Sequence, residues 1–249
     1  MARLTHRQIT FDGQSQGGIW THDGERVIFT FAPDDGRLRV PMWTLADGGG
    51  QTEPLAEAKQ LIEKGRVSMW FTCCLSPDGS YLLGGLNEIA VLPMEGKADP
   101  WPFITTAGFQ RHPAFSPDGR WVAYDTTETG PAEVYVRPFP GPGGITPIST
   151  DGGYEPLWSR DGKELFYRND DKMMVVTVET ESEFKAGTPR ELFKGQFRGS
   201  ATLIDHSYDL TPDGRFIMIQ EDEESAKTKI NVVLNWFEEL KRLVPPGKE

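Results

Sequence analysis

Short apolar runs separated by turn residues follow one another along most of this chain. The runs are rich in β-branched and aromatic residues, and Gly, Pro, Asp or Ser clusters bound them. Examples are RVIFTF at 26–31, WVAYDT at 121–126, ELFYRN at 164–169 and KMMVVTVE at 172–179. This pattern predicts an all-β protein built from many short strands.

One motif recurs five times between these runs: a large apolar residue, Ser or Thr, any residue, Asp and Gly. The copies are Trp20–Gly24, Leu75–Gly79, Phe115–Gly119, Trp158–Gly162 and Leu210–Gly214. The motif Asp residues, at positions 23, 78, 118, 161 and 213, are 55, 40, 43 and 52 residues apart. These spacings surround the period of a four-stranded propeller blade. They predict a five-bladed β-propeller with four-stranded blades, six blades being the alternative.

Each part of the motif has a mechanical reason. The apolar residue ends an inner strand and is expected to be buried between blades. The Asp-Gly pair then makes a tight turn, in which Gly takes a positive φ and Asp accepts hydrogen bonds from nearby backbone. A second and a third strand follow, and segments such as ITPIST and RELFKG are predicted to be outer fourth strands.

The repeat boundaries divide the chain, predicted to be a single domain over 1–249, into blades. We expect them at about 17–55, 68–107, 110–150, 154–195 and 205–235. The last blade lacks a fourth strand, and residues 3–10 form a strand without a blade. Pairing residues 3–10 with 229–235 would remove two open sheet edges and close the ring. Helical spacing of apolar residues predicts short helices over 55–64 and 236–244.

Composition limits the classes of partner and compartment. The 249-residue chain has a formal net charge of −11, which argues against nucleic acid because phosphate binding needs a basic surface. The adjacent Cys73 and Cys74 are expected to be buried strand residues rather than a disulfide scaffold. The sequence shows neither a signal peptide nor a membrane span. It predicts a cytoplasmic protein, or a periplasmic one if an export signal has been removed.

The five motifs resemble the TolB-type, WD-repeat-like propeller family of bacteria. The segments HPAFSPDGRWVAYDTTETGPAEVYVRPFPGPGG and EPLWSRDGKELFYRNDDKMMVV are similar to the C-terminal sensor propellers of bacterial serine/threonine kinases. The resemblance implies binding of peptides, proteins or small ligands at the propeller faces and central channel. It also implies that a kinase or other domain could share a longer parent chain. It carries over no catalytic residues.

Candidate chemistry is confined to the residues just before the inner strands. Kinase and Walker signatures are missing. Six and seven positions before the motif Asp, however, three repeats place titratable or metal-competent groups. These are Arg111, His112, Tyr154, Glu155 and His206. Equivalent strand starts lie on one face of a propeller, so we expect the five side chains to converge at the channel mouth.

Two functions compete on this basis. The first is a non-catalytic recognition or scaffold propeller that binds a peptide, protein or small ligand at the channel mouth. The second is a metal-assisted hydrolase of lactones or phosphoesters, in which His112, Glu155 and His206 hold a divalent metal in the channel. A plainer interpretation is that His112 and Glu155 only bond to loop backbone. A purely architectural propeller that depends on a parent kinase or transporter is a further alternative.

Overall fold

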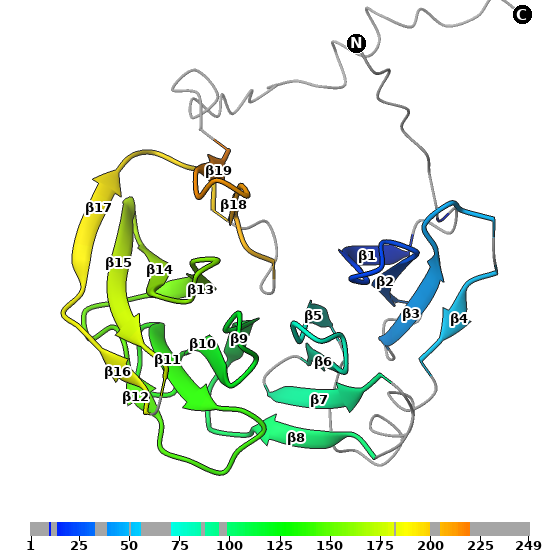
Figure 1. Ribbon diagram of the computed structural model, residues 1–249, viewed down its shortest axis with the longest axis horizontal. Helices are drawn as coiled ribbons and strands as arrows, with labels where there is room; N and C mark the ends of the chain where they lie inside the picture. The colour runs from blue at the N-terminus through cyan, green and yellow to red at the C-terminus, as the bar shows by residue number, and fades with distance from the viewer. Residues whose placement is uncertain are drawn as a thin grey trace, which may run out of the picture. The chain divides into compact units, whose positions relative to one another are not determined.

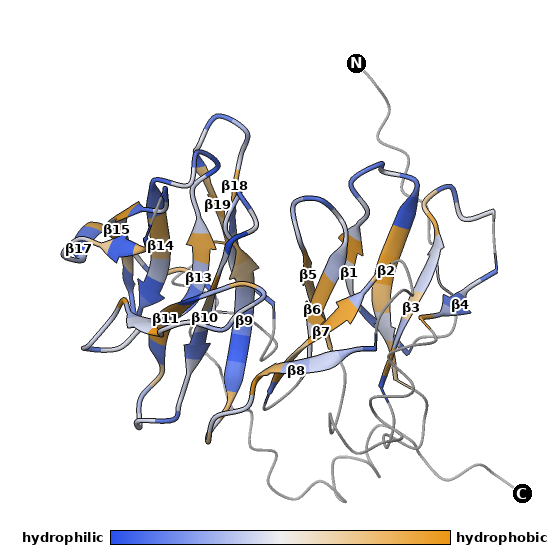
Figure 2. Ribbon diagram, turned by 60° about the horizontal axis from the view of Figure 1, so that its bottom comes forward, coloured by the Kyte–Doolittle hydropathy of each residue, from blue (hydrophilic) through white to orange (hydrophobic). Residues whose placement is uncertain are grey.

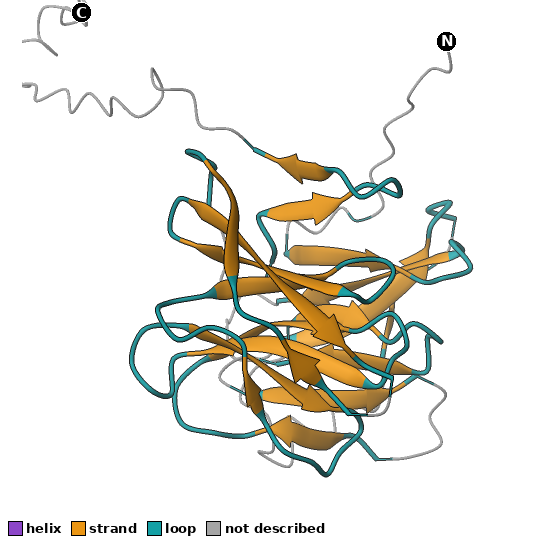
Figure 3. Ribbon diagram, turned by 60° about the vertical axis from the view of Figure 1, so that its left-hand side comes forward, coloured by secondary structure: helices purple, strands orange, loops and turns teal. Residues whose placement is uncertain are grey.

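The computed structural model describes residues 10, 14–32, 39–49, 51–55, 71–85, 88–94, 99–181, 183–199 and 205–219. All of them belong to one contact unit, Met1–Ile219. These residues form strands, turns and loops, with no helix among them (Figure 3). The described part of the chain thus contains no helix long and apolar enough to cross a membrane.

The strands form successive antiparallel sheets in chain order (Figure 1). The first sheet contains β1 (Ser15–Trp20), β2 (Arg26–Phe31), β3 (Val40–Leu45) and β4 (Glu53–Pro54). The second contains β5 (Thr72–Leu75), β6 (Tyr81–Gly84), β7 (Ile89–Pro93) and β8 (Trp101–Ile104). The third contains β9 (Gln110–Phe115), β10 (Trp121–Thr126), β11 (Glu133–Pro138) and β12 (Thr146–Pro147).

The fourth sheet has one strand more than the first three. It contains β13 (Tyr154–Trp158), β14 (Glu164–Asn169) and β15 (Lys172–Glu179), with β16 (Lys185–Ala186) and β17 (Arg190–Lys194) both pairing β15. A hairpin of β18 (Tyr208–Leu210) and β19 (Phe216–Met218) follows. The predicted all-β class, the second strands and the outer strands in ITPIST and RELFKG are confirmed.

The motif turns have the predicted geometry. Their glycines, Gly24, Gly79, Gly119, Gly162 and Gly214, have φ between 70° and 80°, a region that residues with a Cβ rarely adopt. Each motif Asp accepts a hydrogen bond from the preceding Ser or Thr hydroxyl, as Asp161 does from Ser159 at 2.7 Å. This bond lowers the pKa of the Asp161 carboxyl below its ordinary value.

Consecutive turns also touch one another. A Cβ built on Gly79 would lie 3.4 Å from His22 of the preceding turn. Similarly, one on Gly119 would lie 3.5 Å from Pro77, and one on Gly162 would lie 3.5 Å from Pro117. In these three turns the residue just before the motif Asp, which is His22, Pro77 or Pro117, therefore fits against the glycine of the next turn. His22 adds a hydrogen bond from Nε2 to the carbonyl oxygen of Ser76, at 2.8 Å.

The core consists of apolar layers between consecutive sheets. Because strand side chains alternate between faces, neighbouring residues of one strand contribute to different layers. Leu82 packs with Ile28 of the first sheet, whereas Leu83 packs with Val122 of the third. Further layers join the third sheet to the fourth and the fourth sheet to the β18–β19 hairpin. Each middle sheet is thus apolar on both faces.

The predicted burial of the five motif residues is confirmed in part. Trp158 and Leu210 are buried, and Leu75 and Phe115 are half-buried, each against the preceding sheet. The prediction is wrong for Trp20, whose side chain is 62% exposed. The physical reason is its place in the chain: no described sheet precedes the first one, so Trp20 lacks the face on which the other four residues pack.

The last hairpin differs from the others in register. In the first four sheets the motif residue pairs with the residue seven positions later, as Trp158 does with Leu165. Leu210 pairs instead with Phe216, six positions later. A shift of one residue exchanges the two faces of a strand. Phe216 therefore packs toward the fourth sheet, while Ile217 and Ile219 are 56% and 60% exposed.

Several predictions fall on residues outside the described ranges. These are the pairing of residues 3–10 with 229–235, the helix over 236–244 and, except for Leu55, the helix over 55–64. The five-blade count depends on the same segments and stays a prediction.

Replacement of Trp158 by Ala is expected to lower the free energy of unfolding by about 3–5 kcal/mol, the range for a large core aromatic. Trp158 is 5% exposed, and its indole nitrogen donates to the Ala114 carbonyl at 3.0 Å. Trp20→Ala is the matched control, because its side chain is largely in solvent. Chemical denaturation of both variants tests this. Similar losses for the two would show that the sheet-to-sheet packing is assigned incorrectly.

Candidate functional site

The five predicted site residues all lie where the inner strands begin. Arg111 and His112 are on β9, Tyr154 and Glu155 are on β13, and His206 comes two residues before β18. We call these five residues the mouth cluster. Figure 2 shows β9 changing from hydrophilic at its start to hydrophobic at its end. The first residues of this strand are polar, and its last residues are apolar.

A β-bulge shapes the starts of β9 and β13. The pairing register shifts between Arg111 and Ala114 on β9, and between Tyr154 and Leu157 on β13. Within the bulges, His112 has φ 49° and Glu155 has φ 56°, values that are uncommon for residues other than glycine. The equivalent residue of the first sheet is Gly17, with φ 60°. His112 and Glu155 thus occupy a strained position that the first repeat fills with glycine.

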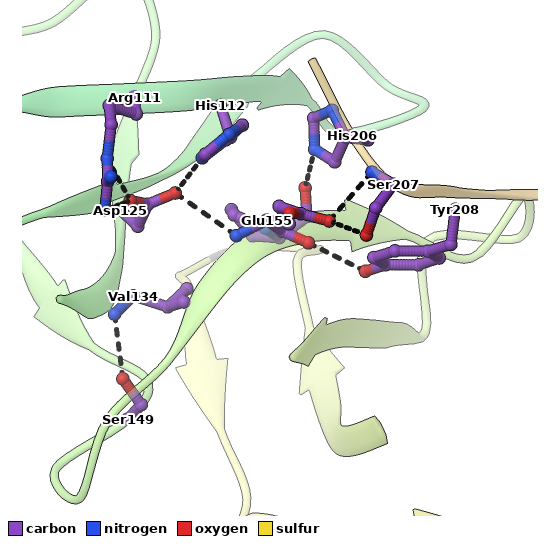
Figure 4. Close-up of polar contacts among 10 residues, drawn as sticks. Arg111, His112, Asp125, Val134, Ser149, Glu155, His206, Ser207 and Tyr208 are labelled. Atoms are coloured by element: carbon purple, nitrogen blue, oxygen red, sulfur yellow. Dashed lines mark hydrogen bonds and ion pairs between the residues drawn. The ribbon is translucent and has the colours of Figure 1, made fainter. Parts of the chain in front are cut away.

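His112 and Arg111 are held by one buried carboxylate. His112 Nδ1 donates to Asp125 Oδ1 at 2.5 Å, and the Arg111 guanidinium contacts Asp125 Oδ2 at 3.0 and 3.1 Å. The Glu155 backbone N–H also donates to Asp125 Oδ1, at 3.2 Å. Asp125 is fully buried, so its charge is balanced only by these donors (Figure 4). It therefore joins the third sheet to the start of the fourth.

Glu155 is held from the other side by the segment that enters β18. The backbone N–H and the hydroxyl of Ser207 both donate to Glu155 Oε2, at 2.8 and 2.5 Å. The Tyr208 hydroxyl donates to the Glu155 carbonyl oxygen at 2.8 Å. Burial raises the pKa of Tyr208 well above its ordinary value, and the Glu155 charge raises it further. Tyr208 consequently stays a neutral donor.

The two histidines of the mouth cluster lie next to each other. Their ring centroids are 5.5 Å apart, with an interplanar angle of 68°. His206 Nε2 donates to the Pro156 carbonyl oxygen at 2.9 Å. Burial lowers the pKa of His206, and the neighbouring His112 lowers it further. Among the residues that the structure describes, the buried His112 Nε2 has no hydrogen-bond partner.

Tyr154 lies at the edge of the cluster, beside a cavity. Its half-buried ring is 5.7 Å from the Arg168 guanidinium, and its hydroxyl donates to the Asp170 carbonyl at 3.4 Å. The cavity has a volume of about 640 Å³ and is lined by loops of the third and fourth sheets, including 129–133, 150–154 and 169–170. These loops lie at the end of the sheets where β9 and β13 begin, because they follow or precede the same strand ends.

A second position in the repeat takes part in the site, and the sequence analysis missed it. Thr30, Gly85, Asp125 and Arg168 each come seven residues after a motif Asp. Three of them bond to the next sheet or the segment that leads into it. Thr30 accepts a hydrogen bond from the Thr72 N–H at 2.9 Å, and Asp125 accepts one from the Glu155 N–H. Arg168 donates to the Ser207 hydroxyl at 2.7 Å. The sequence signal for this position is a polar residue inside an otherwise apolar strand, such as Asp125 in WVAYDT.

The cysteines are free and half-buried, rather than fully buried as predicted. The Cys73 thiol lies 3.5 Å from the Phe71 carbonyl oxygen. The Cys74 thiol donates to the Pro113 carbonyl oxygen at 3.2 Å. Burial raises the pKa of both thiols, that of Cys74 to about 12. Both are therefore protonated and weakly nucleophilic at neutral pH.

The predicted metal ligands meet only in part. His112 and His206 are adjacent. Glu155, in contrast, accepts hydrogen bonds at Oε2 from both the backbone N–H and the hydroxyl of Ser207. In the described residues, no three His, Cys, Asp or Glu side chains are grouped so as to hold a metal ion. A metal site formed by His112, Glu155 and His206 therefore stays a prediction, and the described geometry does not support it.

Asp125→Asn is expected to lower the free energy of unfolding by about 3 kcal/mol, because it removes the charge that balances Arg111 in a buried pair. Asp171→Asn is the matched control, since the Asp171–Lys194 pair is exposed and such pairs contribute less than about 1 kcal/mol. Thermal and denaturant unfolding of the two variants measures the difference. Equal stability would mean that Asp125 is not the joint between the sheets.

Known proteins resemble this chain in fold more than in sequence. No protein-family model and no curated protein matches it. A protein assigned as TolB from Agrobacterium tumefaciens is 18% identical, with a TM-score of 0.54 over 71% of this chain and 64% of that one. TolB from Acinetobacter baumannii is 16% identical, with a TM-score of 0.52 over 80% of this chain and 47% of that one.

An auxiliary nutrient binding protein from Bacteroides thetaiotaomicron is 10% identical, with a TM-score of 0.52 over 83% of this chain and 57% of that one. The chain thus spans less than two thirds of each of these three proteins. At such identities the likeness concerns architecture alone, and the narrower link to kinase sensor propellers stays a prediction. Four successive four- to five-stranded antiparallel sheets, the repeated turn and these structural neighbours together give the chain a β-propeller fold of the TolB type.

Proposed function

We propose that this chain is a non-catalytic recognition propeller that binds a peptide, protein or small ligand at the mouth cluster. The observation that carries this proposal is that neighbouring residues already hold the charged groups of the cluster. Arg111 is paired with Asp125, and Glu155 accepts from Ser207. Groups held in this way take part in ligand binding at little cost in side-chain ordering.

The cavity beside Tyr154 supports the same proposal. Its volume of about 640 Å³ falls in the range of about 300–1,000 Å³ that is usual for small-ligand sites. Asp151 and Asp170 line it, and the Glu133 carboxylate nearby already accepts from the Ser149 hydroxyl and the Gly152 N–H. The acidic lining favours a ligand that presents amine, amide or hydroxyl donors.

The fold is compatible with this role but does not establish it, because propellers host many unrelated activities. One structural neighbour is described as a nutrient binding protein. The support for binding therefore comes from the mouth cluster and the cavity, and the fold only explains why side chains from different repeats meet there.

Tyr154→Ala is expected to weaken ligand binding at least tenfold, because it removes the aromatic ring of the mouth cluster that lines the cavity. The probe is a library of small-molecule fragments and short peptides, screened by ligand-observed NMR. Lys163→Ala is the matched control, since Lys163 lines a different surface cavity, of about 620 Å³. Ligands that respond to Lys163→Ala but not to Tyr154→Ala would place recognition elsewhere and contradict the proposal.

The metal-assisted hydrolase is the second candidate, and one observation favours it. A histidine oriented by a carboxylate, with its other ring nitrogen open, is the arrangement of a general base, and His112 has it through Asp125. The described residues place no hydroxyl or activated thiol at His112 Nε2, which supports recognition over catalysis.

A panel of lactones, carboxyl esters and phosphotriesters distinguishes the two functions. We expect no turnover above that of buffer, with or without added divalent metal. Chelator-sensitive turnover that His112→Gln abolishes would overturn the non-catalytic proposal. His22→Gln is the control, because His22 lies in the first motif turn and bonds there to Ser76.

A further inference from the structure

The ring nitrogens of His112 and His206 are assigned by their hydrogen bonds. A carboxylate or carbonyl oxygen only accepts, so His112 carries its proton on Nδ1, toward Asp125, and His206 carries its proton on Nε2, toward Pro156. In the neutral rings, His112 Nε2 and His206 Nδ1 therefore each hold a lone pair. The buried His112 Nε2 has no hydrogen-bond partner among the described residues, and the bond that His206 makes to Pro156 uses Nε2 and leaves Nδ1 outside it.

These two bonds are of the kind that orients metal-binding histidines. A histidine that ligates a metal nearly always donates its other N–H to a carboxylate or a backbone carbonyl, which fixes the ring and its tautomer. His112 has the carboxylate partner and His206 has the carbonyl partner (Figure 4). The supporting contacts of a two-histidine site are thus already in place.

The separation of the rings fits one shared ion. With metal–nitrogen distances of about 2.1 Å and a tetrahedral angle, two imidazoles on one metal have ring centroids about 5 Å apart. The His112 and His206 centroids are 5.5 Å apart, and the rings are steeply inclined to each other. The buried His112 ring, 3% exposed, leaves its unpartnered nitrogen without compensation from bulk water.

The surrounding charges favour a cation at this place. Two buried carboxylates, Asp125 and Glu155, make hydrogen bonds beside the two rings, and of these two only Asp125 is paired, among the described residues, with a cationic side chain, Arg111. An edge-to-face contact of two imidazoles would account for the ring angle, but it would not satisfy His112 Nε2. A bound cation satisfies both nitrogens at once.

We propose that His112 Nε2 and His206 Nδ1 together bind one divalent transition-metal ion of the borderline class, such as Zn²⁺. Imidazole nitrogen suits this class, in contrast to the oxygen ligands preferred by Ca²⁺ and Mg²⁺. Water or a donor atom of an incoming ligand fills the remaining positions. Glu155 is not a ligand in this site, which distinguishes it from the three-residue set predicted from sequence. The proposal does not depend on the recognition function.

The test is titration of the metal-free, tag-free full chain with ZnCl₂ by calorimetry. We expect one Zn²⁺ per chain, and a loss of affinity of at least tenfold in His112→Gln and in His206→Gln. This is the lower end of the loss seen when even an outer-shell partner is removed, about ten- to a hundredfold. His22→Gln is the matched control, because His22 also donates from Nε2 to a backbone carbonyl but, among the histidines that the structure describes, only His112 and His206 form a ring pair. Its affinity is expected to be unchanged.

A second measurement avoids the risk that His112→Gln fails to fold. Long-range ¹H–¹⁵N NMR of the unmodified protein resolves the ring nitrogens of its four histidines. Zn²⁺ is expected to shift His112 Nε2 and His206 Nδ1 together, whereas the His22 nitrogens and the Ca²⁺ control spectrum stay unchanged. Absence of Zn²⁺ binding, a shift of only one of the two nitrogens, or an affinity that survives both substitutions would overturn the proposal.

Discussion

Packing of each middle sheet against both of its neighbours is the constraint on which the rest of the described structure depends. A four-stranded sheet with two apolar faces is not stable in water on its own, so each sheet needs a neighbour on either side. Leu82 and Leu83 show the principle, because adjacent residues of one strand enter different layers. The same packing brings the first strands of successive sheets side by side. Residues far apart in sequence, such as Glu155 and Ser207, become neighbours for this reason.

Much of the fold could be predicted from local signals in the sequence. The motif fixes a tight turn, and the flanking apolar runs fix a strand on each side, so strands and turns were predicted well. The exposure of Trp20 could not be predicted from the motif, because burial there depends on a neighbouring sheet and not on the residue itself. The shifted pairing register of β19 could not be predicted either, for a related reason. Phe216, Ile217, Met218 and Ile219 are all apolar, so their pattern does not specify a face.

The candidate site was predictable in position but not in bonding. Counting back from the motif Asp located the mouth cluster, since repeat equivalence is a matter of spacing. Which group bonds to which depends on the second strand, where Asp125 and Arg168 lie seven residues after the motif Asp. Their role follows from contacts between sheets that no single repeat contains. This is why Glu155 was expected to be a metal ligand, whereas the structure shows it accepting from Ser207.

The bonds made by the seventh residue after each motif Asp have a consequence for how such a chain can change. Thr30, Asp125 and Arg168 each act on the repeat that follows. Half of each joint is therefore encoded in one repeat and half in the next, so that each joint depends on two consecutive repeats. Duplication of a single repeat places a donor opposite an acceptor selected for a different neighbour. Gly85 occupies the same position in the second repeat without a side chain, and His112 of the following sheet bonds within its own sheet to Asp125.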